Sequence, residues 1–139
     1  MIVATIILVM KDLVSFNQAL ADPTRWRIAA LVRDEAMCVC ELADVLGMPQ
    51  STISSHVQIL RKAGFLESEK LGKWTYFCIE SGLLPLLQEM IGRFEGETDL
   101  VWRDDARKAA RRLAVREASC CPAPRKLILR KTATPQRSS

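Results

Sequence analysis

The sequence predicts a mainly α-helical protein with one small β-hairpin, and three observations carry this prediction. Apolar residues recur at spacings of three and four along several segments, as they do in helices that pack on a core. Pro and Gly divide these segments, notably at Pro23, Gly47 and Gly64. Two short strand-like segments lie on either side of Gly72. With 139 residues, 49% apolar and 26% charged, the chain is large enough for one hydrophobic core but not for two.

An Asp-Pro pair separates the first two expected helices. Residues 13–21 carry apolar side chains near a helical period. Asp22 is a favourable N-cap and Pro23 suits the first helical position, so a second helix should run from there to about Val32. The apolar stretch from Met1 to Met10 is too short to span a bilayer and lacks the basic flank of a signal peptide. Whether translation begins at Met1 or at Met10 stays open.

A strand stub, a short helix and a polar helix follow. Residues 37–39 are expected to form the stub, and Cys40 is expected to cap a helix over residues 41–46. Gly47 ends that helix in the way a C′ glycine does. The polar helix should cover residues 50–63, because its apolar side chains keep a spacing of three and four.

The remaining elements are a hairpin and two helices. Residues 65–70 and 74–80 are strand-like, and alternation along the second strand places Phe77 on one face and Tyr76 on the other. Residues 81–94 form a strongly apolar segment, typical of a helix. A second helix, rich in Ala and Arg, is expected over residues 99–118, and no order is expected from about Pro122 onward.

Charge and cysteine content narrow the function classes. The chain has 9 basic and 11 acidic residues up to residue 95, and 11 basic and 5 acidic residues from Gly96 onward. The basic balance therefore comes from the C-terminal part, and DNA binding would depend on a few well-placed charges. Nothing indicates export, so we expect a cytoplasmic protein whose five cysteines are reduced. The single His and the absence of a nucleophile–base pair or a phosphate-binding glycine loop argue against an enzyme.

The predicted order of elements is that of a winged helix-turn-helix. The motifs within it are Asp22-Pro23-Thr24-Arg25, Cys38-Val39-Cys40-Glu41-Leu42, Gln50-Ser51-Thr52-Ile53-Ser54-Ser55-His56, Leu60-Arg61-Lys62-Ala63-Gly64 and Gly72-Lys73-Trp74. On these motifs the run from Asp22 to Ile79, somewhat under half of the chain, resembles the ArsR/SmtB family of metal-responsive repressors. The resemblance implies a homodimer that binds double-stranded operator DNA and leaves it when an ion binds.

The polar helix has the composition of a DNA-reading helix. In helix-turn-helix proteins this helix lies in the major groove, with its N-terminal residues at base edges. Gln pairs with adenine and hydroxyl groups contact bases or phosphates, while basic side chains and the histidine suit the backbone. The predicted DNA-binding residues are Gln50, Ser51, Thr52, Ser54, Ser55, His56, Gln58, Arg61, and Lys70 and Lys73 on the wing.

Cys38 and Cys40 form the expected effector site. They lie across a strand-to-helix boundary, where the backbone can bring both sulfurs onto one ion, and thiolates select soft ions. The pair is similar to the arsenite and cadmium/lead sites of the family. The arsenite versions carry a third cysteine three residues further on, where this chain has Ala43. Either only two sulfurs bind, or the third comes from elsewhere, for which the resemblance points to Cys120 or Cys121, from the same or the partner subunit.

No permanent cofactor is expected, and the implied effector is As(III) or Sb(III), with Cd(II) or Pb(II) as alternatives. A thiol redox sensor on the same fold is a further alternative. Zinc at the later helix is disfavoured, because residues 81–94 contain no His. The wide apolar face of that helix, together with residues 13–20, is expected to form the dimer surface. We divide the chain into a DNA-binding and dimerisation part, residues 1–95, and a basic C-terminal helix and tail, residues 96–139. No membrane partner is expected.

Overall fold

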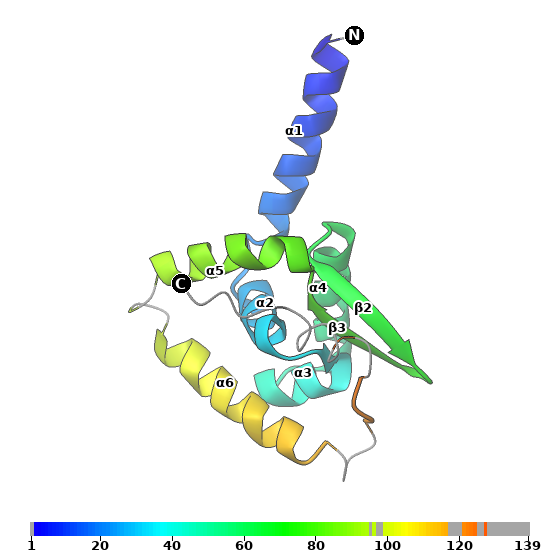
Figure 1. The fold of residues 1–139 in the computed structure, drawn as a ribbon, viewed down its shortest axis with the longest axis vertical. Helices are drawn as coiled ribbons and strands as arrows, with labels where there is room; N and C mark the ends of the chain where they lie inside the picture. Colours follow the sequence, from blue (N-terminus) through cyan, green and yellow to red (C-terminus); the bar gives the residue numbers. More distant parts are fainter. Residues whose placement is uncertain (1, 95, 97–98, 117–120, 125–126, 128–139) are drawn as a thin grey trace.

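The computed structural model describes residues 2–94, 96, 99–116, 121–124 and 127, and its ribbon is the expected winged helix-turn-helix (Figure 1). Within these residues the elements follow one another as α1 (Ile2–Ala19), α2 (Pro23–Asp34), β1 (Met37–Cys38), α3 (Val39–Leu46), α4 (Gln50–Lys62), β2 (Leu66–Leu71), β3 (Trp74–Ile79), a 3-10 turn (Ser81–Leu83), α5 (Leu84–Arg93) and α6 (Asp99–Ala114).

The Asp-Pro boundary between α1 and α2 is confirmed. The Asp22 carboxylate accepts a hydrogen bond of 3.1 Å from the Arg25 backbone N–H, and Pro23 is in the first turn. The first helix begins at Ile2, well before the expected residue 13. In Figure 1, α1 projects away from the other elements, and only its C-terminal end reaches the core, where Phe16 stacks on Phe65 at 4.2 Å.

The expected cap of the short helix at Cys40 is wrong, because α3 begins two residues earlier than predicted. Cys38 is the N-cap, with extended backbone angles, and its N–H donates to the Glu41 carboxylate at 3.1 Å. A carboxylate three residues into a helix that binds back to the capping residue is half of a capping box. Gly47 ends α3 as predicted, at a φ of 64° that favours glycine.

The sheet has three antiparallel strands in the order β1-β3-β2, so β1 extends the hairpin of the wing. Cys38 pairs with Tyr76, and Met37 pairs with Phe77. Phe77 packs into the main core, whereas Tyr76, on the opposite face, is buried with Cys38, Cys121 and Leu127. Both faces of β3 are therefore covered at its centre, one by the helices and one by the C-terminal segment.

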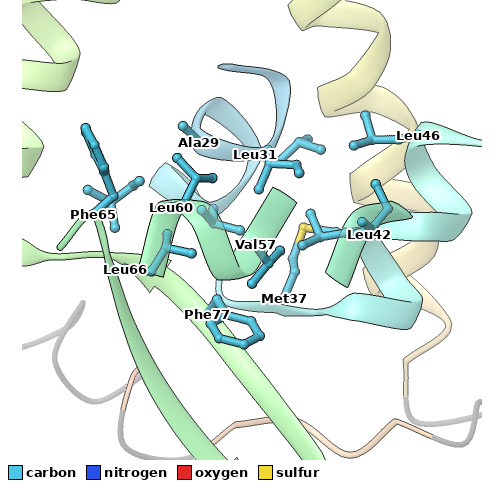
Figure 2. Close-up of a cluster of buried hydrophobic side chains, with 14 of the residues drawn as sticks. Ala29, Leu31, Met37, Leu42, Leu46, Val57, Leu60, Phe65, Leu66 and Phe77 are labelled. Atoms are coloured by element: carbon cyan, nitrogen blue, oxygen red, sulfur yellow. The ribbon is translucent and has the colours of Figure 1, made fainter. Parts of the chain in front are cut away.

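The main core joins the two helices of the helix-turn-helix to the strands behind them. Leu42 and Leu46 of α3 belong to the same cluster as Val57 and Leu60 of α4, and Figure 2 shows the four among the buried side chains of this cluster. All four are almost fully buried. Because protein interiors are close-packed, a displacement of α3 must be transmitted to α4.

Helix α6 lies along α2 and α3, and ion pairs from the helix and from the turn after it hold it there, among them Arg112–Asp44. Arg27 of α2 binds Asp105 through two contacts of 2.8 Å. Arg116, in the turn after α6, binds the fully buried Glu41 carboxylate at 2.8 and 3.0 Å. The helix ends at Ala114, earlier than the expected Ala118. Of the segment expected to lack order, Pro124 and Leu127 are described and buried, and the other residues after 124 lie outside the described part.

None of the helices in the described part of the chain is both long enough and apolar enough to cross a membrane.

The Arg116–Glu41 pair generates a stability prediction. Replacing Arg116 with Met leaves a buried carboxylate without its strongest partner and should lower the free energy of unfolding by about 3 kcal/mol or more. The double variant Glu41→Gln/Arg116→Met should recover much of this loss, since it removes the buried charge but keeps an acceptor for Cys38. Urea denaturation measures both. Arg107→Met, at an exposed position of α6, should cost less than about 0.5 kcal/mol; an equal cost for Arg107 and Arg116 would contradict the prediction.

Candidate metal centre and DNA-reading helix

Three cysteine sulfurs meet at the start of α3. The Sγ atom of Cys40 lies 3.1 Å from that of Cys38 and 3.1 Å from that of Cys121, and the Cys38 and Cys121 sulfurs are 3.6 Å apart. Cys38 and Cys121 are buried, and Cys40 is half-buried. In the described part of the chain these are the residues whose arrangement suits a metal ion. The donor set, three sulfurs and no oxygen, suits a soft ion.

Two segments far apart in sequence supply these thiols. The end of β1 and the first turn of α3 place Cys38 and Cys40 on one side of the backbone, and Cys121 arrives from beyond α6. Of the four predicted ligands, the structure thus brings three together within one chain. Cys120 lies outside the described residues. Cys78, on β3, is half-buried and does not belong to the group of three.

Burial makes the Cys38 thiol a weak acid. The pKa of Cys38 is raised well above its ordinary value, mainly because the side chain is desolvated and also because it hydrogen-bonds to Cys40. The thiol therefore holds its proton at neutral pH, and an ion that binds there must displace it.

Charged side chains surround the sulfurs and were missed by sequence reasoning. Arg116 donates to the Ala36 carbonyl as well as to Glu41, and its guanidinium lies 5.6 Å from the ring centre of Tyr76. Arg112, one turn earlier, donates to Cys121 Sγ at 3.7 Å and to the Asp44 carboxylate at 2.8 Å. The available signal was the spacing of four between the two arginines, which places them on one face of a helix.

The C-terminal segment ties the thiols to the wing. The Tyr76 hydroxyl donates to the Pro122 carbonyl, directly after Cys121. The Leu127 N–H donates to the Glu69 carboxylate of β2 at 3.2 Å, and the Leu127 side chain is buried. Burial and neighbouring negative groups raise the pKa of Tyr76, so its hydroxyl remains a donor. The segment that carries Cys121 is therefore held against strands β2 and β3 of the wing.

The predicted DNA-binding residues lie on the surface of α4 and the wing. Ile53, Val57 and Leu60 form the buried side of α4. The opposite side is polar: Gln50, Ser51, Thr52, Ser55, Gln58 and Arg61 are exposed, as are Lys70 and Lys73 on the wing, while Ser54 and His56 are half-buried.

Arg25 fixes the orientation and tautomer of His56. Its guanidinium donates to the carbonyls of Ala19 at 2.6 Å and of Gln18 at 3.3 Å, and its Nη1 lies 3.2 Å from His56 Nδ1. Because Arg has no acceptor, Nδ1 must be the accepting nitrogen, which leaves the proton of a neutral imidazole on Nε2. Arg25 thus connects the end of α1 to the reading helix and gives His56 one N–H group for an external acceptor.

Comparisons with known proteins agree with this architecture. The model of the family described as bacterial regulatory protein, arsR family, matches residues 22–68. An HTH-type transcriptional regulator of Methanocaldococcus jannaschii is 44% identical over 63 residues, which is 45% of this chain and 71% of that protein.

Two relatives have names that include an effector. The cadmium resistance transcriptional regulatory protein CadC of Listeria innocua is 34% identical over 83 residues, covering 59% of this chain and 70% of its own. The arsenical resistance operon repressor of Escherichia coli is 32% identical over 90 residues, covering 64% and 71%.

Solved structures give the same fold. The homodimeric winged helix-turn-helix domain of a possible ArsR-family regulator from Mycobacterium bovis has a TM-score of 0.57 at 24% identity, over 63% of this chain and 85% of that one. The AntR antimony-specific transcriptional repressor has a TM-score of 0.52 at 26% identity, over 62% and 79%. The chain therefore belongs to the arsR family of bacterial regulatory proteins, and it is a DNA-binding transcriptional repressor rather than an enzyme.

Proposed function

We propose that this repressor acts as a homodimer and leaves its operator when a thiophilic ion, foremost As(III) or Sb(III), binds the sulfurs of Cys38, Cys40 and Cys121. The observation that supports this most strongly is the convergence of three sulfurs within 3.6 Å at the N-terminus of α3. Cys120 stays a predicted alternative donor. Residues 96–139 would then act as the effector arm of a DNA-binding and dimerisation part formed by residues 1–95.

The sulfur separations favour a trivalent metalloid. In a tetrahedral zinc site with Zn–S bonds of about 2.3 Å, two sulfurs lie about 3.8 Å apart. The separations here are 3.1, 3.1 and 3.6 Å, which suits an ion that binds three sulfurs on one side and keeps a lone pair on the other. The names of the E. coli arsenical resistance operon repressor and of AntR support the same class of ion, and the name of CadC supports cadmium as the alternative.

The packing of α3 on α4 supplies a route from the ion to DNA. An ion that binds Cys38 and Cys40 replaces the contacts of their thiols at the first turn of α3, and α3 shares its buried face with α4. Operator release requires only a modest coupling free energy, since about 1.4 kcal/mol changes affinity tenfold. A two-fold symmetric repressor needs two correctly spaced reading helices. A small shift of the reading helix in each subunit therefore weakens the fit to both half-sites.

Exposed apolar residues support the dimer. The side chains of Leu13 and Val14 on α1 and of Leu86 on α5 are 60%, 47% and 47% exposed. Exposed apolar side chains that form a patch commonly mark a protein–protein contact. The M. bovis neighbour is a homodimer by its own description. We assign the α1 and α5 faces to the contact between two copies of the chain.

A redox-sensing repressor is the second candidate, and the short sulfur distances favour it. Two thiols of this cluster could join as a disulfide when peroxide is reduced to two molecules of water. Such a sensor would release DNA with peroxide alone, without a metalloid.

Operator release by arsenite tests the proposal. With reduced protein and an operator selected from a random duplex library, arsenite near one equivalent per subunit should release the DNA, measured by fluorescence anisotropy. Cys38→Ser, Cys40→Ser and Cys121→Ser should each weaken the response at least tenfold, whereas Cys78→Ser serves as the matched thiol control and should respond like the native chain. Release by peroxide but not by arsenite would replace the metalloid sensor with the redox sensor.

The proton balance predicts opposite pH dependences for two ions. The raised pKa of Cys38 keeps its thiol protonated near pH 7. Uncharged arsenous acid exchanges its hydroxyl groups for thiols, and the thiol protons leave in water, so arsenite affinity should change less than about threefold between pH 6 and pH 8. Cadmium instead releases the thiol protons to solvent, so its affinity should rise by about tenfold per pH unit for each proton displaced. Calorimetry in two buffers of different ionisation enthalpy counts the protons; equal proton release by both ions would contradict this balance.

The Arg25–His56 contact predicts a defined DNA contact. Since His56 is the one histidine of the chain, ¹⁵N NMR of the imidazole should report the Nε2–H tautomer in the native protein and a mixture of tautomers in Arg25→Met. We expect the Nε2–H group to donate to a DNA phosphate. His56→Phe should therefore weaken operator binding about thirtyfold, because a dimer loses two such hydrogen bonds of about 1 kcal/mol each. Unchanged binding by His56→Phe would reduce His56 to a structural link between α1 and α4.

A further inference from the structure

The guanidinium of Arg112 touches the thiol cluster and is itself held in place. It donates to Cys121 Sγ at 3.7 Å and, through Nε, to the Asp44 carboxylate at 2.8 Å, and its Nη1 lies 3.9 Å from Glu41. The Arg112 side chain is 15% exposed, whereas that of Asp44 is 60% exposed. A charged group thus lies in direct contact with a proposed ligand atom, and its partner can be changed from the surface.

The charges beside the sulfurs balance in the described part of the chain. Arg112 is paired with Asp44, and Arg116 is paired with Glu41. Each pair consists of one guanidinium and one carboxylate, and the two pairs adjoin, since Arg112 also lies 3.9 Å from Glu41. The described surroundings therefore add no net charge to whatever occupies the three sulfurs.

The possible adducts differ in charge. Three thiolates on a trivalent ion form a neutral complex, and three thiolates on a divalent ion form an anion. Two of the three sulfurs are buried, and burying a net charge without a compensating partner is costly. A balanced environment consequently favours the neutral adduct.

We propose that the Arg112–Asp44 pair is a specificity-determining element of the thiol site, which accepts the neutral adduct of a trivalent metalloid and discriminates against the anionic tris-thiolate of a divalent metal. This inference rests on the proposed function, because it assumes that the three sulfurs bind the effector. Asp44 neutralises Arg112 and so withholds from the site the positive charge that a divalent adduct would need.

Two substitutions change the charge in opposite directions. Asp44→Asn releases the Arg112 charge toward the sulfurs and should raise the affinity for cadmium relative to arsenite about tenfold. Arg112→Gln leaves Asp44 without its cation and should lower the same ratio, whereas Arg112→Lys keeps the charge and should stay near the native ratio. Asp104→Asn is the matched control, because it changes the net charge of the protein by the same amount as Asp44→Asn. Asp104 is an exposed carboxylate on α6, paired with Lys108 and about 12 Å along the helix from Arg112.

The measurement is a competition titration of the reduced full-length protein with cadmium and arsenite, monitored by the ultraviolet absorption of the cadmium–thiolate bonds. A rise of the cadmium-to-arsenite ratio in Asp44→Asn but not in Asp104→Asn is the expected result. An unchanged ratio in Asp44→Asn, in protein that binds both ions through Cys121, would overturn the charge proposal and leave the proposed function intact. Binding of both ions that is indifferent to Cys121→Ser would instead overturn the three-sulfur site itself. Because Asp44 is exposed, its variant tests the proposal even if Arg112→Gln fails to fold.

Discussion

The structure around the thiols depends on one buried carboxylate. Glu41 is fully buried, and it accepts hydrogen bonds from the Cys38 backbone N–H and from the Arg116 guanidinium. The first contact begins α3 at Cys38, and the second fastens the turn after α6 to that helix. A buried charge is tolerated only where its partners are fixed, so Glu41 imposes one position on β1, α3 and the end of α6 together. This constraint fixes Cys38, and the Tyr76–Pro122 contact holds Cys121 beside it.

The wing takes part in the same arrangement. Strand β3 pairs with β1 at Cys38, and Tyr76 on that strand contacts the segment that follows Cys121. The proposed effector site therefore borders on both predicted DNA-binding surfaces, on α4 through the packing of α3 and on the wing through β3. An effector releases DNA only if it interacts differently with the DNA-binding and the released conformations of these elements. The geometry offers two such paths from a single site.

Sequence reasoning recovered what is encoded locally. Asp22, Gly47 and Gly64 punctuate the helices through their own backbone preferences, so the order of elements and the polar face of α4 followed from spacing alone. The cap of α3 was misplaced because it depends on Glu41, whose carboxylate is fixed by Arg116, 75 residues away. The contact of Arg112 with the thiol cluster was not predicted for the same reason. Its charge looked like part of a solvated helix, and its contact with Cys121 exists only in the folded chain.

Because the proposed ligands come from segments 83 residues apart, the proposal makes ion binding and the docking of α6 thermodynamically linked. An ion that binds all three sulfurs has no equivalent site in a chain whose C-terminal segment is detached. Any bound ion must therefore stabilise the docked form, by an amount that grows with the logarithm of its concentration over its dissociation constant. Conversely, a change that weakens the contact between Arg116 and Glu41 must lower the affinity for the ion. If the proposed site binds the effector, the ion pairs that dock α6 and the turn after it contribute to its affinity together with the cysteines.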